Sequence, residues 1–435
     1  MPLPYIRKNF VRTNKMVLEN PSERIKYMLL LCFASVLFFL SFVFNSPAEI
    51  IWGSLVILLS PANLVTDYFE LANIGAALLN ASVMTFLSIG MIALNRAKIT
   101  GLLIAAIFTV AGFSLFGKNL FNSVPIILGI LFYAKITKVS FGVYLLPALF
   151  GTALGPLVSE FAFNLGLPAV GGICLGFFVG FLAGLVLPPL SNSFVAFHKG
   201  FNLYNVGFTS GIIGTFFIGV LRSFGIEVDT VFIISSGNNK VFAIILYSIF
   251  AAMFLFGFKY NNCGLKGIKK ILRETGRLGT DFVDVGGFCS VLMNMALLGV
   301  ISTSYVLLVG GELSGPVIGG ILTVVGFGAC GKHPKNILPV LGGIYLVGLL
   351  NSDEVFSPIA LMAALFGTTL APVSGHFGPF AGMIAGAFHM TLTMNISNLH
   401  AGMNLYNNGF SGGFVAAALV PIFEGFASVT KKERT

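Results

Sequence analysis

Charged residues are scarce in this sequence. Only 9% of its 435 residues are Asp, Glu, Lys or Arg, whereas 56% are hydrophobic, and the mean hydropathy is +0.93. A soluble domain needs polar side chains to cover its surface, and this composition excludes such a fold because it supplies too few of them. A surface that faces lipid needs none. The composition therefore predicts an integral membrane protein.

Motifs of enzymes and of metal sites are missing as well. The sequence contains no His-Glu-x-x-His, no Gly-x-Ser-x-Gly and no P-loop. The cysteines form no Cys-x-x-Cys pair and no metal-ligand spacing, so we expect free thiols. We therefore predict no catalytic residue, no metal site, no cofactor and no enzyme activity. The five cysteines are Cys32, Cys174, Cys263, Cys289 and Cys330.

The charge that is present is unevenly placed. The 25 Lys and Arg residues outnumber the 16 Asp and Glu residues, and they gather in an N-terminal arm, a central loop at 259–277 and a C-terminal tail. These stretches flank apolar segments, as cytoplasmic loops do under the positive-inside rule. No basic face carries interleaved aromatic side chains, so we expect no nucleic acid as a partner. With both termini in the cytoplasm, only Lys118, Arg222 and Lys240 fall on the outer side.

About fourteen apolar segments are candidates for membrane spans, since roughly 20 apolar residues cross a bilayer and fewer suffice inside a protein. Several are short and rich in Gly or Pro, which predicts broken or re-entrant helices. The stretch 50–60 is too short to cross, and we expect it in the interface or dipping back into the membrane. The candidates are 27–45, 68–94, 101–116, 120–135, 139–157, 168–190, 201–222, 240–258, 282–309, 314–330, 337–350, 356–372, 379–398 and 404–424.

The two halves of the sequence resemble each other, which indicates an internal repeat. Equivalent positions are separated by seven predicted spans, an odd number, so they would lie on opposite sides of the membrane. We therefore predict an all-α polytopic transmembrane helix bundle of two inverted-topology repeats, about seven spans each, as in many secondary transporters. An offset of 214 residues pairs Asp67 with Asp281, Asn80 with Asn294, Lys118 with Lys332, Asn122 with Asn336 and Pro125 with Pro339.

The predicted organisation has five parts, of which the two repeats are the largest. They are a basic cytoplasmic arm (1–26), a first transmembrane repeat (27–225), an extracytoplasmic connector (226–239), a second, inverted repeat (240–430) and a cytoplasmic tail (431–435).

One motif, His-x-Gly-x-Asn-Leu-Tyr-Asn-x-Gly-Phe, occurs in both halves. It begins at His198 and again at His400, and nine of fourteen aligned positions are identical. Polar side chains between apolar stretches are costly unless they pair or face a cavity. They either line a solute site or satisfy backbone groups at a helix break, and the sequence leaves both readings open. The candidate substrate-binding residues are His198, Asn202, Tyr204, Asn205, His400, Asn404, Tyr406 and Asn407.

Three further polar features have two interpretations each. Lys118 and Lys332 follow a glycine and precede a short apolar segment, so they either attract an anionic solute or snorkel to the surface. Asp67 and Asp281 begin long apolar segments and either cap a helix or couple to an ion. The polar residues from His389 to Asn398 either line a pathway or form interhelical hydrogen bonds.

The Thr-Asp-Tyr segment that begins at Thr66, Asn80 and the doubled Asn-Leu-Tyr-Asn-x-Gly-Phe resemble an uncharacterised family of bacterial multi-spanning membrane proteins. That family carries only a domain-of-unknown-function label, so the resemblance implies a bacterial cell membrane and no substrate. The inverted halves and the Asn-x-Gly-Phe-x-x-Gly turns are similar in architecture to urea-transporter-like channels.

From the repeat we predict a transporter, permease or channel that moves a small polar or anionic solute through a midplane site between the halves. A membrane-embedded enzyme that uses a histidine as acid/base, or a non-transporting membrane scaffold, is the alternative. The expected partners are membrane lipid and a small-molecule or ion substrate, and the sequence leaves homo-oligomerisation open.

Overall fold

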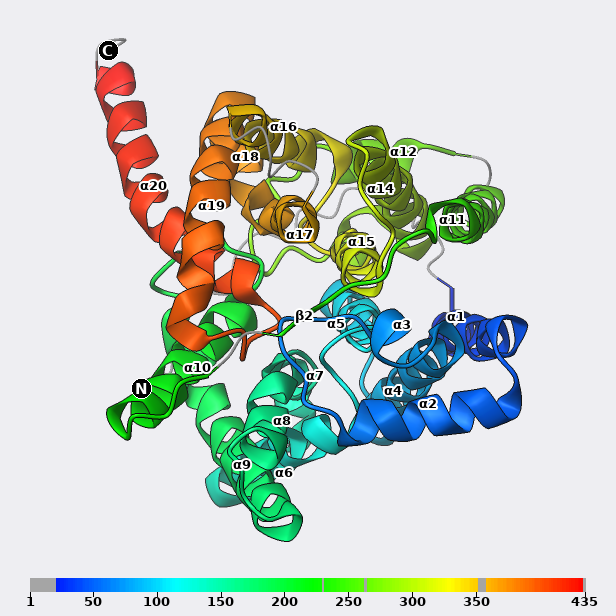
Figure 1. Ribbon diagram of the computed structural model, residues 1–435. Helices are drawn as coiled ribbons and strands as arrows, with labels where there is room; N and C mark the ends of the chain where they lie inside the picture. The colour runs from blue at the N-terminus through cyan, green and yellow to red at the C-terminus, as the bar shows by residue number, and fades with distance from the viewer. Residues whose placement is uncertain (1–20, 229–230, 262–263, 351–356, 433–435) are drawn as a thin grey trace.

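The structure is a computed structural model that describes residues 21–228, 231–261, 264–350 and 357–432. These residues form a bundle of helices in two lobes, one made by each half of the chain (Figure 1). Strand structure among them is limited to β1 (Val65–Thr66), which pairs in parallel with β2 (Phe232–Ile233). This short pairing ties the first half to the segment that leads into the second.

Ten helical segments are long and apolar enough to cross a membrane, so this is a multi-pass, all-α membrane protein, as the composition predicts. Eight of them are α1 (Glu23–Phe44), α4 (Ile74–Leu94), α6 (Leu120–Thr137), α9 (Ala169–Phe194), α10 (Asn205–Ser223), α11 (Asn239–Tyr260), α14 (Phe288–Leu308) and α20 (Asn407–Lys432). The other two are each built from two short helices, α7 (Leu145–Gly151) with α8 (Gly155–Phe163) and α17 (Pro358–Gly367) with α18 (Ala371–Phe377).

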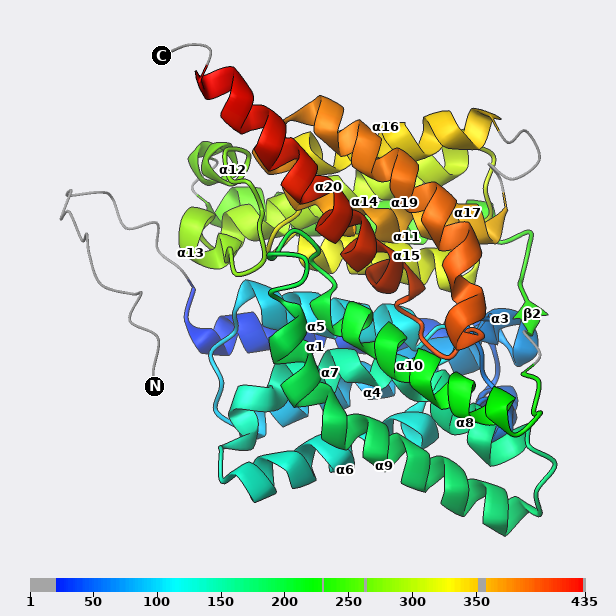
Figure 2. The ribbon, with the colours of Figure 1, turned by 90° about the vertical axis from the view of Figure 1, so that its left-hand side faces the viewer.

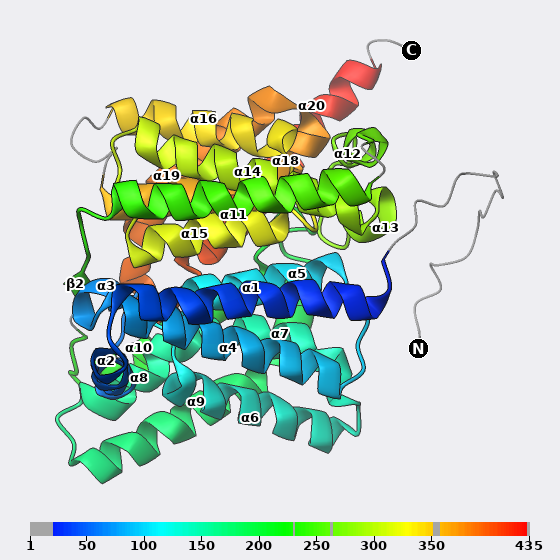
Figure 3. The ribbon, with the colours of Figure 1, turned by 90° about the vertical axis from the view of Figure 1, so that its right-hand side faces the viewer.

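Shorter helices complete both halves. The apolar ones are α2 (Pro47–Leu59), α5 (Gly101–Phe113), α15 (Gly315–Phe327) and α16 (Pro334–Leu350), and α19 (Pro379–His400) is longer but more polar. The smallest are α3 (Tyr68–Leu71), α12 (Lys266–Ile271) and α13 (Phe282–Gly286). The long helices α1 and α11 cross the molecule side by side, and α2 lies almost perpendicular to them, as expected for an interfacial helix (Figure 3).

Equivalent helices of the two halves meet at the centre of the molecule. The short helices α5 and α15 are in such close contact that a Cβ on Gly112 would lie 2.6 Å from the carbonyl oxygen of Gly319. Further along, Gly326 lies against Ala105, so the residue numbers rise along one helix as they fall along the other. The two equivalent helices therefore run antiparallel, which an inverted repeat requires. The insertion of the halves in opposite orientations stays a prediction.

Four predicted spans are interrupted in the structure, one of them 282–309, which divides at Gly287 into α13 and α14. Four others, 101–116, 314–330, 337–350 and 379–398, form helices that are not among the ten long apolar segments. The segment 68–94 is two helices, because the side chain of Asn73 accepts a hydrogen bond from Ala76 N and starts α4 anew. The segments 139–157 and 356–372 each bend at a 3₁₀ turn, at Thr152–Leu154 and Thr368–Leu370. A proline follows each turn in the first positions of the next helix, where its missing N–H costs nothing.

The acidic residues at the helix starts act as caps, which confirms the capping interpretation. Asp67 accepts hydrogen bonds from Phe69 N in its own half and from Gly315 N at the start of α15. Asp281 likewise accepts from Val283 N and from Gly101 N at the start of α5. Each half therefore caps a short central helix of the other. Burial raises the pKa of both carboxyl groups, and these hydrogen bonds lower it in part.

Candidate functional site

The doubled motif forms two helix breaks, one between α9 and α10 and one between α19 and α20. In each break the histidine Nε2 lies 2.9 Å from an asparagine Oδ1, His198 with Asn205 and His400 with Asn407. Asn205 Nδ2 then donates to Ser191 O, a carbonyl of the preceding helix. The asparagine-histidine pairs thus hold each break closed within its own half.

The other asparagine of each motif connects the two halves. Asn202 Nδ2 donates to Gly409 O at 2.9 Å, and Asn404 Nδ2 donates to Gly207 O at 3.0 Å. Between these two bonds the rings of Tyr204 and Tyr406 lie side by side with centroids 4.8 Å apart. The two copies are therefore interlocked at the centre of the molecule, where α10 and α20 begin and diverge (Figure 2).

These contacts suit a structural helix break, because Asn205 bonds to a carbonyl in the last turn of α9, and Asn202 and Asn404 bond to first-turn carbonyls of α20 and α10. The same segment also reaches a cavity of about 360 Å³, lined by Tyr204, Asn205 and Tyr406. Its lining combines α7 and α9 of the first half with Leu278 and Phe327 of the second. The predicted residues thus include three that face a space between the halves and others that hold the breaks in shape.

The two lysines lie in turns that are built in the same way. Asn80 Nδ2 donates to Lys118 O at 2.9 Å, and its repeat partner Asn294 donates to Lys332 O at 2.8 Å. Both lysine side chains are buried, with 1% and 0% exposure respectively. A snorkelling lysine would reach solvent or the interface, so the snorkelling interpretation is wrong for both.

The surroundings of the two ammonium groups differ. Lys332 Nζ donates to Tyr204 Oη and, at 2.7 Å, to Thr368 Oγ1, and it lies 4.6 Å from the centre of the Tyr204 ring. Lys118 Nζ makes no hydrogen bond to any residue that the structure describes, and instead Lys118 lines a cavity of about 400 Å³. The residue equivalent to Tyr204 is Tyr406, and its hydroxyl donates to Thr109 Oγ1 at 3.2 Å.

The polar stretch of α19 forms interhelical hydrogen bonds, one of its two predicted roles. His389 Nε2 lies 2.9 Å from Asn408 Oδ1, and Thr393 Oγ1 pairs with Ser411 Oγ, so both contacts join α19 to α20. Thr391 is exposed, and its described hydrogen bonds go to carbonyls of its own helix.

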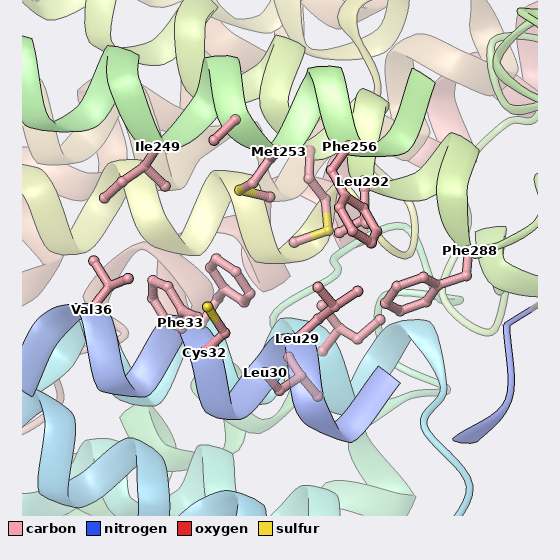
Figure 4. Close-up of a pocket in the computed structure, with 14 residues that line it drawn as sticks. Leu29, Leu30, Cys32, Phe33, Val36, Ile249, Met253, Phe256, Phe288 and Leu292 are labelled. Atoms are coloured by element: carbon pink, nitrogen blue, oxygen red, sulfur yellow. The ribbon is translucent and has the colours of Figure 1, made fainter. Parts of the chain in front are cut away.

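A third cavity, of about 250 Å³, lies between the halves on the side of α1 and α11. Figure 4 shows apolar side chains such as Phe33, Met253 and Phe288 pointing into it, from α1, α11 and α14. Such a lining offers nothing to orient a polar solute, so this cavity is not the candidate site. Of the predicted free thiols, Cys32 contributes to it. The described cysteines are unpaired, and Cys263 lies outside the described residues.

Sequence reasoning missed the threonines that accept hydrogen bonds from Tyr406 and Lys332, which are Thr109 and Thr368. Thr109 and Thr323 are equivalent by the offset of 214, and Thr152 and Thr368 are equivalent in the two 3₁₀ turns, where the offset is 216. Hydroxyls retained at equivalent buried positions were the available signal. Thr369 is different, because its equivalent is Ala153, and only the second half supplies this extra hydroxyl, which donates to Asn202 Oδ1 at 2.6 Å.

Together these features define a class of multi-pass membrane protein that is built from a duplicated helical unit interlocked at its centre. The chain belongs to the DUF1576 family, described as a protein of unknown function, whose model matches residues 46–223 and 260–425, one match in each half. No curated protein and no solved structure matches the chain.

Proposed function

We propose that this protein is a transporter, permease or channel for a small polar or anionic solute in the bacterial plasma membrane. The observation that carries the proposal is the cavity of about 360 Å³ between the halves, which is lined by both tyrosines of the doubled motif. A buried lysine, Lys332, bonds to Tyr204 directly at this lining. A cation held inside a membrane protein is costly, and a site for a negative group is a common reason to keep one.

The differing contacts of the two copies support alternating access. In this structure Tyr204 is bonded to Lys332 and Tyr406 to Thr109. Repeat symmetry offers the opposite arrangement, in which Tyr406 bonds to Lys118 and Tyr204 to Thr323. Exchange of the two arrangements would turn each half into the conformation of the other, which is how inverted repeats open to alternate sides.

The proposed orientation places both termini in the cytoplasm. The start of α1, the basic helix α12 and the end of α20 lie at the same end of the molecule, which supports it (Figure 3). Reporter fusions after Lys98 and Lys270 should report cytoplasm, and one after Glu227 should report the outside. A cytoplasmic signal at Glu227 would remove the inverted orientation and the alternating-access argument with it.

Transport is tested with the purified protein in sealed vesicles, by uptake of labelled acetate, phosphate, chloride and glycine. We expect one class to enter, and both Tyr204→Phe and Lys332→Met to slow that entry about tenfold or more, since each removes a contact at the cavity wall. The matched control is Lys335→Met, which removes an exposed lysine three residues away. Vesicles no more permeable than protein-free ones to any small solute would favour the scaffold or the enzyme.

A further inference from the structure

The cavity at Lys118 has the chemistry of a binding site for one kind of ligand. Most of its lining is apolar, including Met84, Leu87 and Ile127 from α4 and α6. The polar groups are the ammonium of Lys118 and the hydroxyls of Ser88, Ser123 and Thr152, and no Asp or Glu is among the described residues that line it. A single positive group at one place in an apolar cavity matches a ligand with one negative group and an apolar body.

Two polar atoms at this cavity have no hydrogen-bond partner among the described residues. Lys118 is 1% exposed, yet its Nζ has no hydrogen bond to a described residue. Ser123 is equally buried, and its Oγ also has no partner among the described residues. An ammonium that faces a largely apolar cavity without a hydrogen bond is unfavourable, and the buried, unpaired hydroxyl of Ser123 adds to the cost. Both costs are removed by a ligand that brings a negative charge and hydrogen-bond acceptors.

The second half shows what such an ammonium requires. Around Lys332 two oxygens, Tyr204 Oη and Thr368 Oγ1, accept its hydrogen bonds. At Lys118 the equivalent tyrosine is turned away to Thr109. The two oxygens of a carboxylate can take the places of these two acceptors, and Ser123 Oγ can donate to one of them.

The exposed part of the cavity lining is apolar. Its outer lining residues Leu87, Leu94 and Leu120 are 47%, 85% and 41% exposed, and they belong to α4 and α6 on the outside of the first lobe. Apolar side chains exposed on a membrane bundle face acyl chains. A ligand that enters here is therefore one that already resides in the bilayer.

We infer that the cavity at Lys118 binds a single-chain carboxylate of the fatty-acid type, with the carboxylate on Lys118 and Ser123 and the chain between α4 and α6. A volume of about 400 Å³ suits one acyl chain of moderate length. This site goes beyond the proposed function, since binding here needs no passage across the membrane.

The test uses the full-length protein in phosphatidylcholine nanodiscs and compares binding of labelled decanoate with that of decanol, the same chain without charge. We expect saturable decanoate binding that falls about tenfold or more in Lys118→Met, because the ion pair is lost. Decanol should bind weakly and equally to both proteins. Lys335→Met is the matched control and should bind decanoate as the original protein does. Equal decanoate affinity in Lys118→Met and the original protein would overturn the inference.

A second variant and a change of lipid complete the experiment. If Lys118→Met does not fold, Ser123→Ala replaces it and should weaken decanoate binding severalfold; unchanged affinity there counts against the site. Adding phosphatidylglycerol to the nanodiscs tests the lipid source, and full displacement of decanoate would show a phospholipid site instead. Because the discs have no transport step, failure here leaves the proposed function intact, and a failed uptake experiment leaves this site intact.

Discussion

The turn that carries Lys118 and the turn that carries Lys332 share their backbone supports, but their side chains have different partners. In both, an asparagine from the preceding long helix holds the lysine carbonyl, and a second asparagine, Asn122 or Asn336, holds the carbonyl of the glycine before it. Lys332 then bonds to Tyr204, whereas Tyr406 bonds to Thr109, and Lys118 has no hydrogen-bond partner among the described residues. The two turns therefore share the same backbone hydrogen bonds. They differ in the hydrogen-bond partner of the tyrosine, which is Lys332 for Tyr204 and Thr109 for Tyr406.

The largest expected difference between the halves concerns the two capping carboxylates. Asp67 accepts four hydrogen bonds, because Ser235 N and Oγ join Phe69 N and Gly315 N, whereas Asp281 accepts two. Asp67→Ala should lower the free energy of unfolding by about 2–5 kcal/mol and Asp281→Ala by about 1–3 kcal/mol, as buried donors lose their acceptor. Thermal melting in detergent measures both. Equal losses would mean that the Ser235 contacts contribute nothing.

A second comparison sets the two lysines against each other. Lys332→Met leaves Tyr204 Oη without its partner and should cost about 1–3 kcal/mol of stability. Lys118→Met removes an ammonium that has no hydrogen bond to a described residue, so stability should stay the same or rise. Melting of both variants in the same detergent, without added carboxylate, is the measurement. A larger loss for Lys118→Met would show that the lysine already has a stabilising partner.

A third difference lies at the 3₁₀ turns, where the second half has Thr369 at the position that Ala153 occupies in the first half. Thr369 Oγ1 donates to Asn202 Oδ1 and accepts from Tyr204 N at 3.0 Å, contacts that Ala153 cannot offer to Asn404. Thr369→Val keeps the shape of the side chain and should lower stability by about 1 kcal/mol. In the Thr369→Val background, Asn202→Ala should cost about as much as Asn404→Ala, whereas in the original protein it should cost more.

The smallest expected effect separates Thr109 from Thr323. Thr109 Oγ1 accepts the hydrogen bond of Tyr406, whereas the one described partner of Thr323 Oγ1 is Gly319 O of its own helix. Thr109→Val should therefore cost about 0.5–1.5 kcal/mol and Thr323→Val less. For uptake the expectation differs from that for stability. Thr323→Val should slow uptake, since the proposed exchange needs Thr323 as the other partner of Tyr204. Slower uptake in Thr323→Val at unchanged melting temperature would sharpen the comparison, and unaltered uptake would count against the exchange.

The sequence was sufficient for the membrane character, the helical class and the duplicated motif, and it indicated capping as one of two roles for Asp67. These depend on composition and on identities at a fixed offset, which a single sequence displays. The contact of Asn202 with Gly409 and the choice of Tyr406 for Thr109 were not predictable, because they depend on how the halves pack. The 3₁₀ turn at Thr152 was missed for a related reason, since an apolar segment has the same composition whether its helix is continuous or interrupted.

The crosswise caps also have a consequence for how the chain is made. The N–H of Gly101 receives its cap from Asp281, a residue 180 positions later. At about 5–20 residues per second, the ribosome delivers that carboxylate roughly 10–40 s after the start of α5 has been synthesised. During that interval the start of α5 has only its local cap, in which Thr100 Oγ1 accepts from Leu103 N, and the Gly101 N–H lacks its acceptor. The last hydrogen bond at the start of α5 therefore forms only after the second half has been translated.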